Sequence, residues 1–529
     1  MFIKKLLIAL ILLAIVTRFI RLDYAPPHLS NDEIGAAYAA YSISRTMRDG
    51  NNQFLPILWT SHAGYGSPLA VYLPLVSIVF LGNSDFAVRL PSAVLGSLTI
   101  IFIGLLVMEL TRNNKLAIIT SFLLAFSPWH FSASRWALES NYGLFFLVLG
   151  IYLFFLGLKN NKNWVTIISF ISFSLSVYSY YTEWVLTPLI IISLLVFYRK
   201  KVFKKKIYYL AIALFGILSA PIFFDFFRHL SSSRAVSEFI INDINVGRLL
   251  SGNPGFFEKG QIILKAILDK FSSYFSLDYL FFYGAKLLPN ENPYQFGFFL
   301  SPFLIAFVLG LFVLKTYFKN NSGFIYFLLI ASPLAASITE GDINNWRSLP
   351  QLLPVALVTA VGTLNIWGYI KDSLWMKILG LGLLAVSLLY FVLVYSFHFP
   401  IEKAEGYQYG YKQLALYINQ NYEKYEKIII DPRFGNKDYY YIGVPSSYIP
   451  FYTYLSPVKV QNAKYFLGGT AFDKYEFRDI DWANEKVQKN YLYSVPYDIV
   501  PALGSGLKLV YEIQLPNWRP VFKLYSLME

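Results

Sequence analysis

Residues 89–110 read "RLPSAVLGSLTIIFIGLLVMEL", an apolar block that opens on an arginine and is followed by the polar run "TRNNK". A helix of about 20 such residues crosses the hydrocarbon core of a bilayer, which is about 30 Å thick. Similar blocks recur along the chain. The eleven predicted spans are roughly 5–22, 89–110, 116–132, 141–158, 164–181, 185–198, 207–226, 296–317, 324–339, 348–369 and 377–398. This pattern predicts an all-α polytopic membrane protein.

The amino-acid composition agrees with this fold class. Of the 529 residues, 56% are hydrophobic and 15% are charged, whereas soluble domains carry about 25% charged residues. The chain has no cysteine, which excludes disulfides and thiolate metal sites. The first 20 residues hold two lysines and an apolar run but no small-residue cleavage site, so we interpret them as an uncleaved first span.

The net charge of +13 is concentrated in short segments between the predicted spans. Six segments and their edges contain sixteen lysines or arginines against two acids, Glu109 and Asp372. Such a basic excess marks the cytoplasmic side of a membrane protein. We therefore interpret the charge as an orientation signal with contact to membrane lipids, not as a nucleic-acid surface. The six segments are 1–5, 111–115, 159–163, 199–206, 315–321 and 371–377.

This orientation predicts two domains. We expect a transmembrane domain at 1–398, with outer loops at about 23–88 and 227–295, and a small extracytoplasmic α/β domain at 399–529. The first outer loop contains an apolar stretch at 67–82, which two prolines interrupt. A span there would invert every later loop, so we interpret this stretch as interfacial or re-entrant.

The extracytoplasmic domain carries both helical and strand patterns. Residues 411–425 have helical periodicity, and 427–431 read as a short buried strand. Residues 507–515 and 519–527 predict a hairpin around the turn "PNW".

The stretch "SNDEIGAAYAAYS", residues 30–42, predicts a capped helix directly after the first span. Ser30 and Glu33 have the S-x-x-E spacing of a capping box, in which each side chain bonds the backbone amide of the other. On this basis Glu33→Ala would cost about 1 kcal/mol, as cap losses do. Asp32 is not needed for the box. Its alternatives are a surface acid that gains from the helix dipole or a chemically active carboxylate.

Basic, acidic and aromatic side chains gather at the outward ends of other predicted spans. Individually they read as snorkelling arginines and an interfacial aromatic belt. Together they predict a polar cavity, because ionisable groups at this depth are expensive and usually functional. An arginine fork suits a phosphate, and a carboxylate suits deprotonation of a hydroxyl. The predicted substrate-binding residues are Arg89, Arg135, Glu139, Tyr181, Trp346 and Arg347.

With these residues in view, the chain resembles the membrane glycosyltransferases of the C-type superfamily, in the protein O-mannosyltransferase and aminoarabinose transferase group. The matching stretches include "SNDEIGAAYAAYSISRTMRDG", "FAVRLPSAVLGSLTI", "FSPWHFSASRWALESNYGLFFLVLG" and "NNWRSLPQLLPVAL". The resemblance implies that Asp32 is the catalytic carboxylate with Glu33 beside it, and that Arg347 holds a lipid phosphate. The sequence departs from the group's pattern at 281–297, where the resemblance implies a polar turn that helps to form the acceptor side.

These observations predict a glycosyltransferase on the outer face of the cell membrane. It would move a sugar from a polyprenyl-phosphate donor to a protein, lipid or glycan acceptor, with Asp32 as base. One alternative is a transporter or flippase of lipid-linked sugars, which predicts charges at the bilayer midplane and repeated halves. Another is a glycan polymerase or ligase. Only the adjacent acids Asp32 and Glu33 favour the glycosyltransferase over this alternative. The sequence identifies no cofactor; a divalent metal is compatible with this chemistry, but its ligands are not evident.

Overall fold

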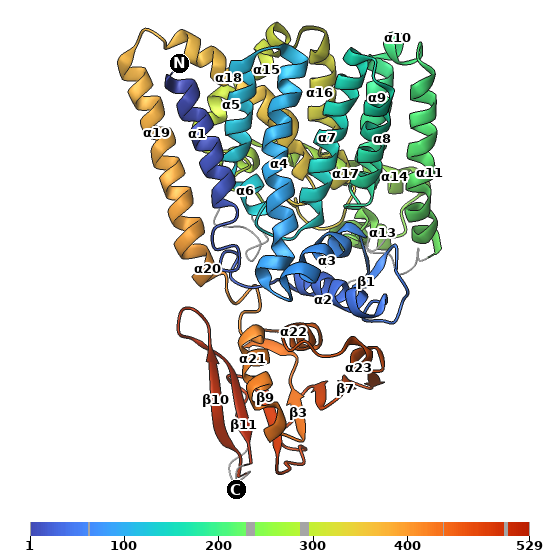
Figure 1. Ribbon diagram of the computed structural model, residues 1–529, viewed down its shortest axis with the longest axis vertical. Coiled ribbons are helices and arrows are strands. Elements are labelled where there is room, and N and C mark those ends of the chain that lie inside the picture. The colour runs from blue at the N-terminus through green and yellow to red at the C-terminus, as the bar shows by residue number, and fades with distance from the viewer. Residues whose placement is uncertain are drawn as a thin grey trace. The chain divides into compact units, whose positions relative to one another are not determined.

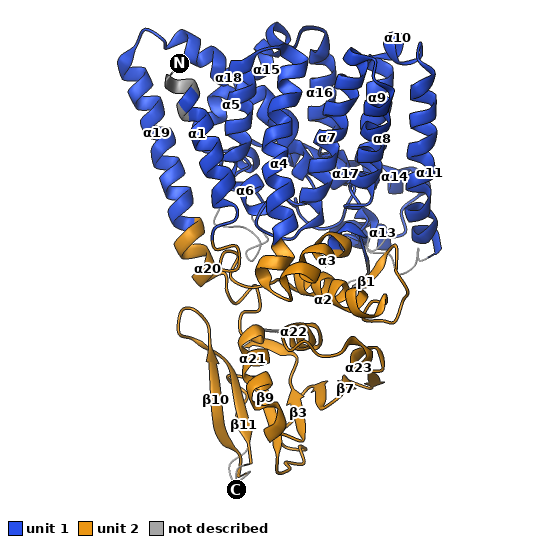
Figure 2. Cartoon of the chain, viewed as in Figure 1, with its two compact units in different colours: residues 1–20, 63–70, 90–394 blue, residues 21–62, 71–89, 395–529 orange. Residues whose placement is uncertain are grey.

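The computed structural model describes residues 2–61, 64–228, 238–285, 296–436, 439–501 and 506–527. The chain forms two compact units, each assembled from segments that lie far apart in the sequence (Figure 2). Unit 1 contains residues 1–20, 63–70 and 90–394, and unit 2 contains residues 21–62, 71–89 and 395–529. The boundary at 398/399 that the sequence suggests stays a prediction. The departure at 281–297 falls largely outside the described residues.

Unit 1 is a bundle of long apolar helices (Figure 1). Each of the eleven predicted spans overlaps a helix of the described chain, with bounds that differ by several residues in places. These helices are α1 (Phe2–Thr17), α4 (Asp85–Thr111), α5 (Asn114–Ala125), α7 (Glu139–Asn160), α8 (Asn163–Val177), α9 (Glu183–Phe197), α11 (Lys206–Arg228), α15 (Leu304–Phe318), α16 (Ser322–Ala331), α18 (Leu352–Tyr369) and α19 (Leu374–Leu393).

Further helices, most of them short, lie between these in the sequence of unit 1. They are α6 (Pro128–Ala133), α10 (Arg199–Val202), η2 (Ile240–Asn242), α13 (Ile244–Ser251), α14 (Phe256–Ser273), η3 (Asp278–Phe282), η4 (Ser301–Phe303), η5 (Lys319–Asn321), α17 (Leu334–Ser337) and η6 (Leu349–Gln351).

Six stretches within the described residues are helical, long and apolar enough to cross a membrane. They are Asp85–Thr111, Glu139–Asn160, Lys206–Arg228, Ser301–Ser337, Leu349–Tyr369 and Leu374–Glu402. Five shorter apolar helices accompany them: Leu7–Thr17, Leu69–Leu81, Asn114–Ala125, Asn163–Val177 and Glu183–Phe197. The predicted class, a mostly helical multi-pass membrane protein, is confirmed.

Small residues let the helices of unit 1 approach one another closely. A Cβ added at Gly362 of α18 would lie 1.7 Å from the Ala306 carbonyl oxygen of α15. One added at Gly310 of α15 would lie 2.0 Å from the Val358 carbonyl oxygen. Within a membrane, helix association depends on such backbone approach, since lipid tails are as apolar as leucine side chains.

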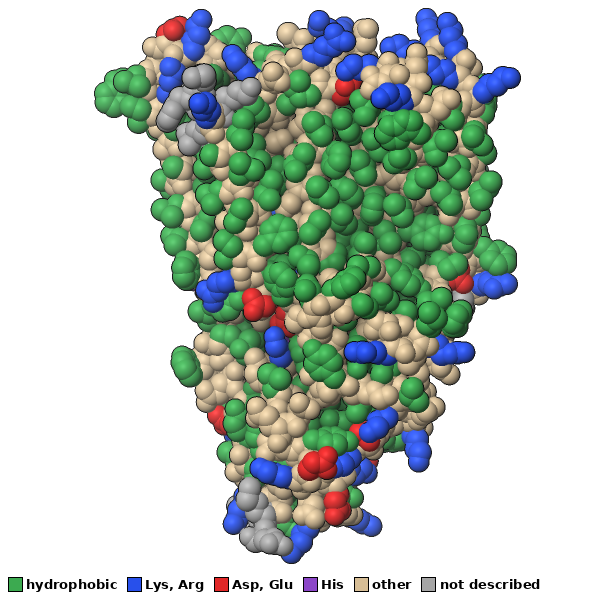
Figure 3. Space-filling view, viewed as in Figure 1, with side chains coloured by type: hydrophobic (Ala, Val, Ile, Leu, Met, Phe, Trp, Pro, Cys, Tyr) green, Lys and Arg blue, Asp and Glu red, His purple; other side chains and the backbone are tan. Residues whose placement is uncertain are grey.

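Many of the basic residues of unit 1 lie at one end of the bundle. Figure 3 displays Lys and Arg side chains at the end where α10 lies, and mostly hydrophobic side chains along the flank. The helix ends and turns there carry Arg112, Lys159 and the run from Arg199 to Lys206. This segregation is the one that the loop charges predict.

Unit 2 combines the first outer segment with the C-terminal part of the chain. Its first segment contains α2 (Asn31–Thr46), the strand β1 (Trp59–Ser61), α3 (Leu69–Leu81) from Val71 onward and the first residues of α4. The strand β2 (Gly64–Gly66) and the first two residues of α3 belong to unit 1. The helix α3 occupies the stretch interpreted as interfacial or re-entrant. Its C-terminal segment begins with η7 (Val394–His398) and α20 (Phe399–Glu402).

The C-terminal segment of unit 2 forms a mixed seven-stranded sheet in the order β10-β11-β9-β3-β8-β7-β6. The strands are β3 (Lys427–Ile430), β6 (Lys464–Phe466), β7 (Gly469–Phe472), β8 (Tyr475–Arg478), β9 (Tyr491–Pro496), β10 (Lys508–Gln514) and β11 (Pro520–Ser526). A separate hairpin pairs β4 (Arg433–Asn436) with β5 (Tyr439–Ile442). The accompanying helices are α21 (Tyr411–Asn421), η8 (Tyr422–Lys424), α22 (Pro445–Tyr452) and α23 (Pro457–Gln461).

The three elements predicted for the C-terminal segment are all present. The helix is α21, the buried strand is β3, and β10 pairs antiparallel with β11 around the predicted turn. β3 lies in the middle of the sheet because it pairs in parallel with both β8 and β9. Its residue Ile429 packs with Tyr493 and Val495 in the core.

Hydrogen bonds join the two sequence segments of unit 2. Asn83 donates from Nδ2 to the Phe451 carbonyl at 2.7 Å, and Tyr41 donates to the Tyr454 carbonyl at 3.1 Å. Asp85, which is buried, accepts from Tyr452 at 2.6 Å and pairs with Lys412 at 3.1 Å. The helix α2, which carries Asp32 and Glu33, is therefore held by contacts with the C-terminal segment.

Candidate functional site

The helix α2 begins with the predicted capping box. The Ser30 hydroxyl accepts from the Glu33 backbone amide at 3.3 Å, and the Glu33 carboxylate accepts from the Ser30 amide at 2.9 Å. The two bonds satisfy backbone donors that have no partner within the helix. The local spacing in the sequence was sufficient to predict this arrangement.

Glu33 has a second partner that the spacing did not reveal. Arg89, from the start of α4, donates through Nε to Glu33 Oε1 at 2.8 Å and through Nη2 to Oε2 at 3.0 Å. Both side chains are fully buried. This bidentate pair is the strong form of a charge-assisted hydrogen bond.

Arg89 also fastens the chain that leads into α2. It donates to the backbone carbonyls of Leu22, Pro26 and His28 at 3.1, 2.8 and 2.5 Å. Together with the ion pair, these bonds account structurally for both Glu33 and Arg89. The binding and catalytic roles that the sequence suggests for them stay predictions.

Asp32 is in a different position from its neighbour. It lies in the first turn of α2, is exposed, and is not part of the capping box. The first turn of a helix favours a negative charge, because the backbone amides there point toward it. Asp32 therefore presents its carboxylate on a helix whose start is held by Glu33 and Arg89.

In unit 1, the structure brings together two of the predicted binding residues, Arg347 and Tyr181. Glu238 joins them: it pairs with Arg347 Nη2 at 2.9 Å and accepts a short hydrogen bond from the Tyr181 hydroxyl. Tyr180 donates to Tyr181 at 3.0 Å, and Arg347 also donates to the Glu340 carbonyl at 2.9 Å. We call Arg347, Glu238 and Tyr181 the arginine cluster.

The electrostatics of the arginine cluster keep Arg347 charged. Burial lowers the pKa of Arg347, but the neighbouring Tyr181, Tyr180 and Glu238 raise it more, so it lies above the ordinary value. Sequence reasoning missed Glu238. It lies in the second outer loop, more than a hundred positions before Arg347, and no motif marks it.

A buried lysine supports the loop that leads to Arg347. Lys270, on α14, donates from Nζ to the carbonyls of Thr339, Glu340 and Gly341 at 2.7, 3.1 and 2.8 Å. Burial, and then the charge of Arg347, lower the pKa of Lys270 to about 8. The loop just before Arg347 is thus tied to α14.

The other predicted residues of unit 1 have separate surroundings. Trp346 packs edge-on against Trp129 and Trp136, with ring centroids 4.9 Å away in each case. Arg135 donates through Nη1 to the carbonyls at the end of α1, which are those of Thr17, Arg18 and Ile20, at 2.6, 3.1 and 2.9 Å. Glu139 is half-buried in the first turn of α7.

Within the described part of the chain, no three His, Asp or Glu side chains are grouped so that they could hold a metal ion. Both ordered clusters, the Glu33–Arg89 pair and the arginine cluster, pair acids with arginines.

Comparison with known proteins gives one family match. The family model described as dolichyl-phosphate-mannose-protein mannosyltransferase matches residues 65–224. No curated protein sequence matches the chain.

Solved structures match over nearly the whole chain. ArnT from Cupriavidus metallidurans in the apo state is 13% identical, with a TM-score of 0.56, and the match covers 98% of this chain and 97% of that one. The same protein bound to undecaprenyl phosphate is 12% identical, with a TM-score of 0.57 and the same coverage. The oligosaccharyltransferase AglB from Archaeoglobus fulgidus is 13% identical, with a TM-score of 0.47, covering 85% of this chain and 64% of that one.

The fold is therefore that of the C-type membrane glycosyltransferases, as the sequence resemblance predicts. Within that class, the chain resembles the group that contains ArnT and the protein O-mannosyltransferases. The family match and the shared fold support, as its general chemistry, the transfer of a sugar that is linked to a lipid phosphate.

Proposed function

We propose that this protein transfers a sugar from a polyprenyl-phosphate donor to a hydroxyl of a protein, lipid or glycan acceptor, on the outer face of the membrane. ArnT, whose fold it shares, has been solved with undecaprenyl phosphate bound, which supports a donor of this kind. The family match to mannosyltransferases supports a hexose or a related sugar as the transferred group.

Asp32 acts as the base in this proposal. Its carboxylate accepts the proton of the acceptor hydroxyl, and the freed oxygen attacks the anomeric carbon of the sugar. The bond from that carbon to the phosphate oxygen breaks, and the lipid phosphate leaves with the electron pair. A single displacement of this kind inverts the configuration at the anomeric carbon.

One observation carries the proposal: Asp32 is exposed in the first turn of α2, and the start of this helix is held in place by the Ser30–Glu33 capping box and the Glu33–Arg89 pair. The direct test incubates the purified protein with radiolabelled polyprenyl-phosphate sugars and membrane extract. Label should pass from one donor to an acceptor with inversion. Absence of transfer from every lipid-linked sugar in the panel would contradict the proposal.

Arg347 is expected to hold the lipid phosphate. Arg347→Lys should lower activity at least tenfold, because lysine keeps the charge but loses the planar fork that binds two oxygens at once. The measurement is transfer rate against donor concentration, with KM expected to rise. Arg21→Lys is the control, since Arg21 is exposed and stacks on Tyr24. Equal tolerance at both positions would leave Arg347 as a structural anchor of the loop.

The orientation can be tested by thiol labelling, because the chain has no native cysteine. Cysteine introduced at Asn51 should react with a membrane-impermeant reagent in intact cells, and cysteine at Lys204 should not. Both positions are exposed in the structure, so burial does not distinguish them. Labelling at Lys204 without labelling at Asn51 would reverse the orientation.

A further inference from the structure

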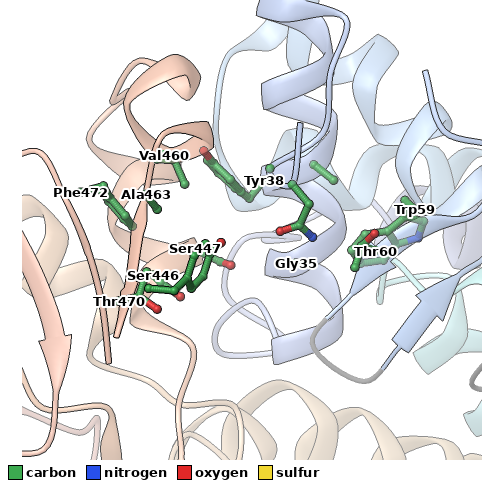
Figure 4. A pocket seen from close by; sticks show the side chains of 14 residues that line it. Gly35, Tyr38, Trp59, Thr60, Ser446, Ser447, Val460, Ala463, Thr470 and Phe472 are labelled. Atoms are coloured by element: carbon green, nitrogen blue, oxygen red, sulfur yellow. The ribbon is translucent and has the colours of Figure 1, made fainter. Parts of the chain in front are cut away.

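Unit 2 contains a cavity of about 300 Å³ beside the helix that carries Asp32. Figure 4 displays its walls: α2 and β1 supply Tyr38, Trp59 and Thr60, and the C-terminal segment supplies Ser446, Thr470 and Phe472. This volume is at the small end of the range of about 300–1,000 Å³ that is typical of small-molecule pockets.

Three polar groups of the cavity wall lack a hydrogen-bond partner among the described residues. They are the Tyr38 hydroxyl, the Trp59 indole N–H and the Thr60 hydroxyl. Tyr38 and Trp59 are each 5% exposed. Buried polar groups are nearly always satisfied, since an unsatisfied one loses its hydration without compensation. Three such groups in one wall indicate a ligand that completes them.

The chemistry of the wall narrows the class of ligand. None of the fourteen side chains that line the cavity is charged. Aromatic rings of Tyr38, Trp59 and Phe472 alternate with hydroxyls and with the amide of Asn51. Hydroxyls and amides can both donate and accept, and rings pack on C–H faces. A ligand with many hydroxyls and apolar ring faces, that is, an uncharged sugar, matches this combination.

The cavity adjoins Asp32 along α2. Gly35 and Ala39 line it, and they follow Asp32 by three and seven residues, which places all three on one face of the helix. Three residues correspond to a rise of about 4.5 Å. A sugar in the cavity would therefore lie about one helical turn from the carboxylate.

We infer that this cavity binds an uncharged sugar unit of the acceptor and presents one of its hydroxyls toward Asp32. The inference rests on the proposed function for the role of Asp32. The acceptor is favoured over the donor because no Lys, Arg or His lines the cavity to meet a lipid phosphate. The natural acceptor is thus a glycan or a glycosylated lipid or protein.

Binding can be measured with soluble methyl glycosides of common hexoses and N-acetylhexosamines. Saturation-transfer NMR on the full-length protein in detergent should detect at least one of them. Tyr38→Phe should weaken that glycoside about three- to tenfold, as the loss of one hydrogen bond does. The Tyr38 hydroxyl has no partner among the described residues. Without ligand, the thermal stability of the Tyr38→Phe variant should therefore equal or exceed that of the native protein. Ala39→Leu, which fills the cavity, should abolish binding.

Tyr41→Phe is the matched control. Its hydroxyl lies on the same helix but donates to the carbonyls of Tyr454 and Leu455 at 3.1 and 3.3 Å. The Tyr41→Phe variant should therefore be less stable than the native protein and should bind the glycoside equally well. The inference is overturned if no glycoside binds, or if Tyr38→Phe and Tyr41→Phe behave alike.

Two further arms separate this inference from the proposed function. Asp32→Asn should lose sugar transfer but still bind the glycoside. If this variant binds the glycoside and also transfers normally, the role of Asp32 as base is wrong, and the assignment of the cavity is unaffected. Addition of a polyprenyl-phosphate sugar should not displace the glycoside. Competitive displacement would assign the cavity to the donor sugar and overturn the acceptor assignment.

Discussion

Asp32→Asn is expected to lower the rate of sugar transfer by about a hundredfold or more, because general-base catalysis typically supplies about 10²- to 10⁴-fold. Asparagine has nearly the same size and keeps a hydrogen-bonding oxygen, but it cannot accept the proton of the acceptor hydroxyl. The substitution leaves the capping box and the Glu33–Arg89 pair in place, so the fold should persist. Single-turnover rates with radiolabelled donor, together with donor affinity, measure the effect.

Asp23→Asn is a suitable control for this experiment. Asp23 is another exposed acid of the same outer segment, and its loss changes the net charge by the same amount. It should leave the rate within about twofold, as surface changes away from specific contacts do. If Asp32→Asn is only a few-fold slower than the native protein, Asp32 is not the base, and Glu33 and Glu139 become the candidates for that role.

The second large effect is expected at the Glu33–Arg89 pair. Removing one partner of a buried ion pair costs about 3–5 kcal/mol, because the remaining charge stays buried without compensation. Glu33→Ala should therefore destabilise the protein well beyond the roughly 1 kcal/mol that a lost helix cap costs. Chemical denaturation of the purified protein in detergent, followed by its tryptophan fluorescence, measures the change in the free energy of unfolding.

A double-mutant cycle tests the origin of this cost. Replacing both partners, as in Glu33→Leu with Arg89→Met, leaves no buried charge and should be less destabilising than Arg89→Met alone. Arg89 also binds three carbonyls, so the double variant should not recover fully. If the two single losses simply added, the pair would be energetically independent and the interpretation wrong.

Much of the fold could be predicted because its signals are local. Runs of apolar residues of membrane-spanning length identify helices without knowledge of their neighbours, and each predicted span overlaps a helix. The Ser30–Glu33 box and the β10–β11 hairpin are also determined by residues close in sequence. The strand order of the seven-stranded sheet could not be predicted in this way. β3 pairs in parallel with β8 and β9, and parallel partners are not joined by a short turn that the sequence would reveal.

The candidate site shows the same limit. Arg89 and Glu33 were both predicted as site residues, but their pairing joins positions 56 residues apart. It changes the expected effect of Glu33→Ala from a cap loss to the loss of an ion pair. Glu238 was not predicted at all, because a single glutamate in a long outer loop has no pattern to identify it. Arg135 was predicted to bind substrate, and in the structure it donates hydrogen bonds to backbone carbonyls at the end of α1.

The discontinuous make-up of unit 2 has a consequence for biosynthesis. The segment that contains α2 leaves the ribosome early, whereas its hydrogen-bond partners lie after Tyr395. The bonded pairs are separated by 327 to 413 residues. At about 5–20 residues per second, synthesis of these intervals takes roughly 15–80 s. During that interval the nascent chain exposes Asp85 without Lys412 and Tyr452. Unit 2 can therefore be completed only after α21 and α22 have been synthesised, so formation of the helix bundle and completion of unit 2 are separate events in time.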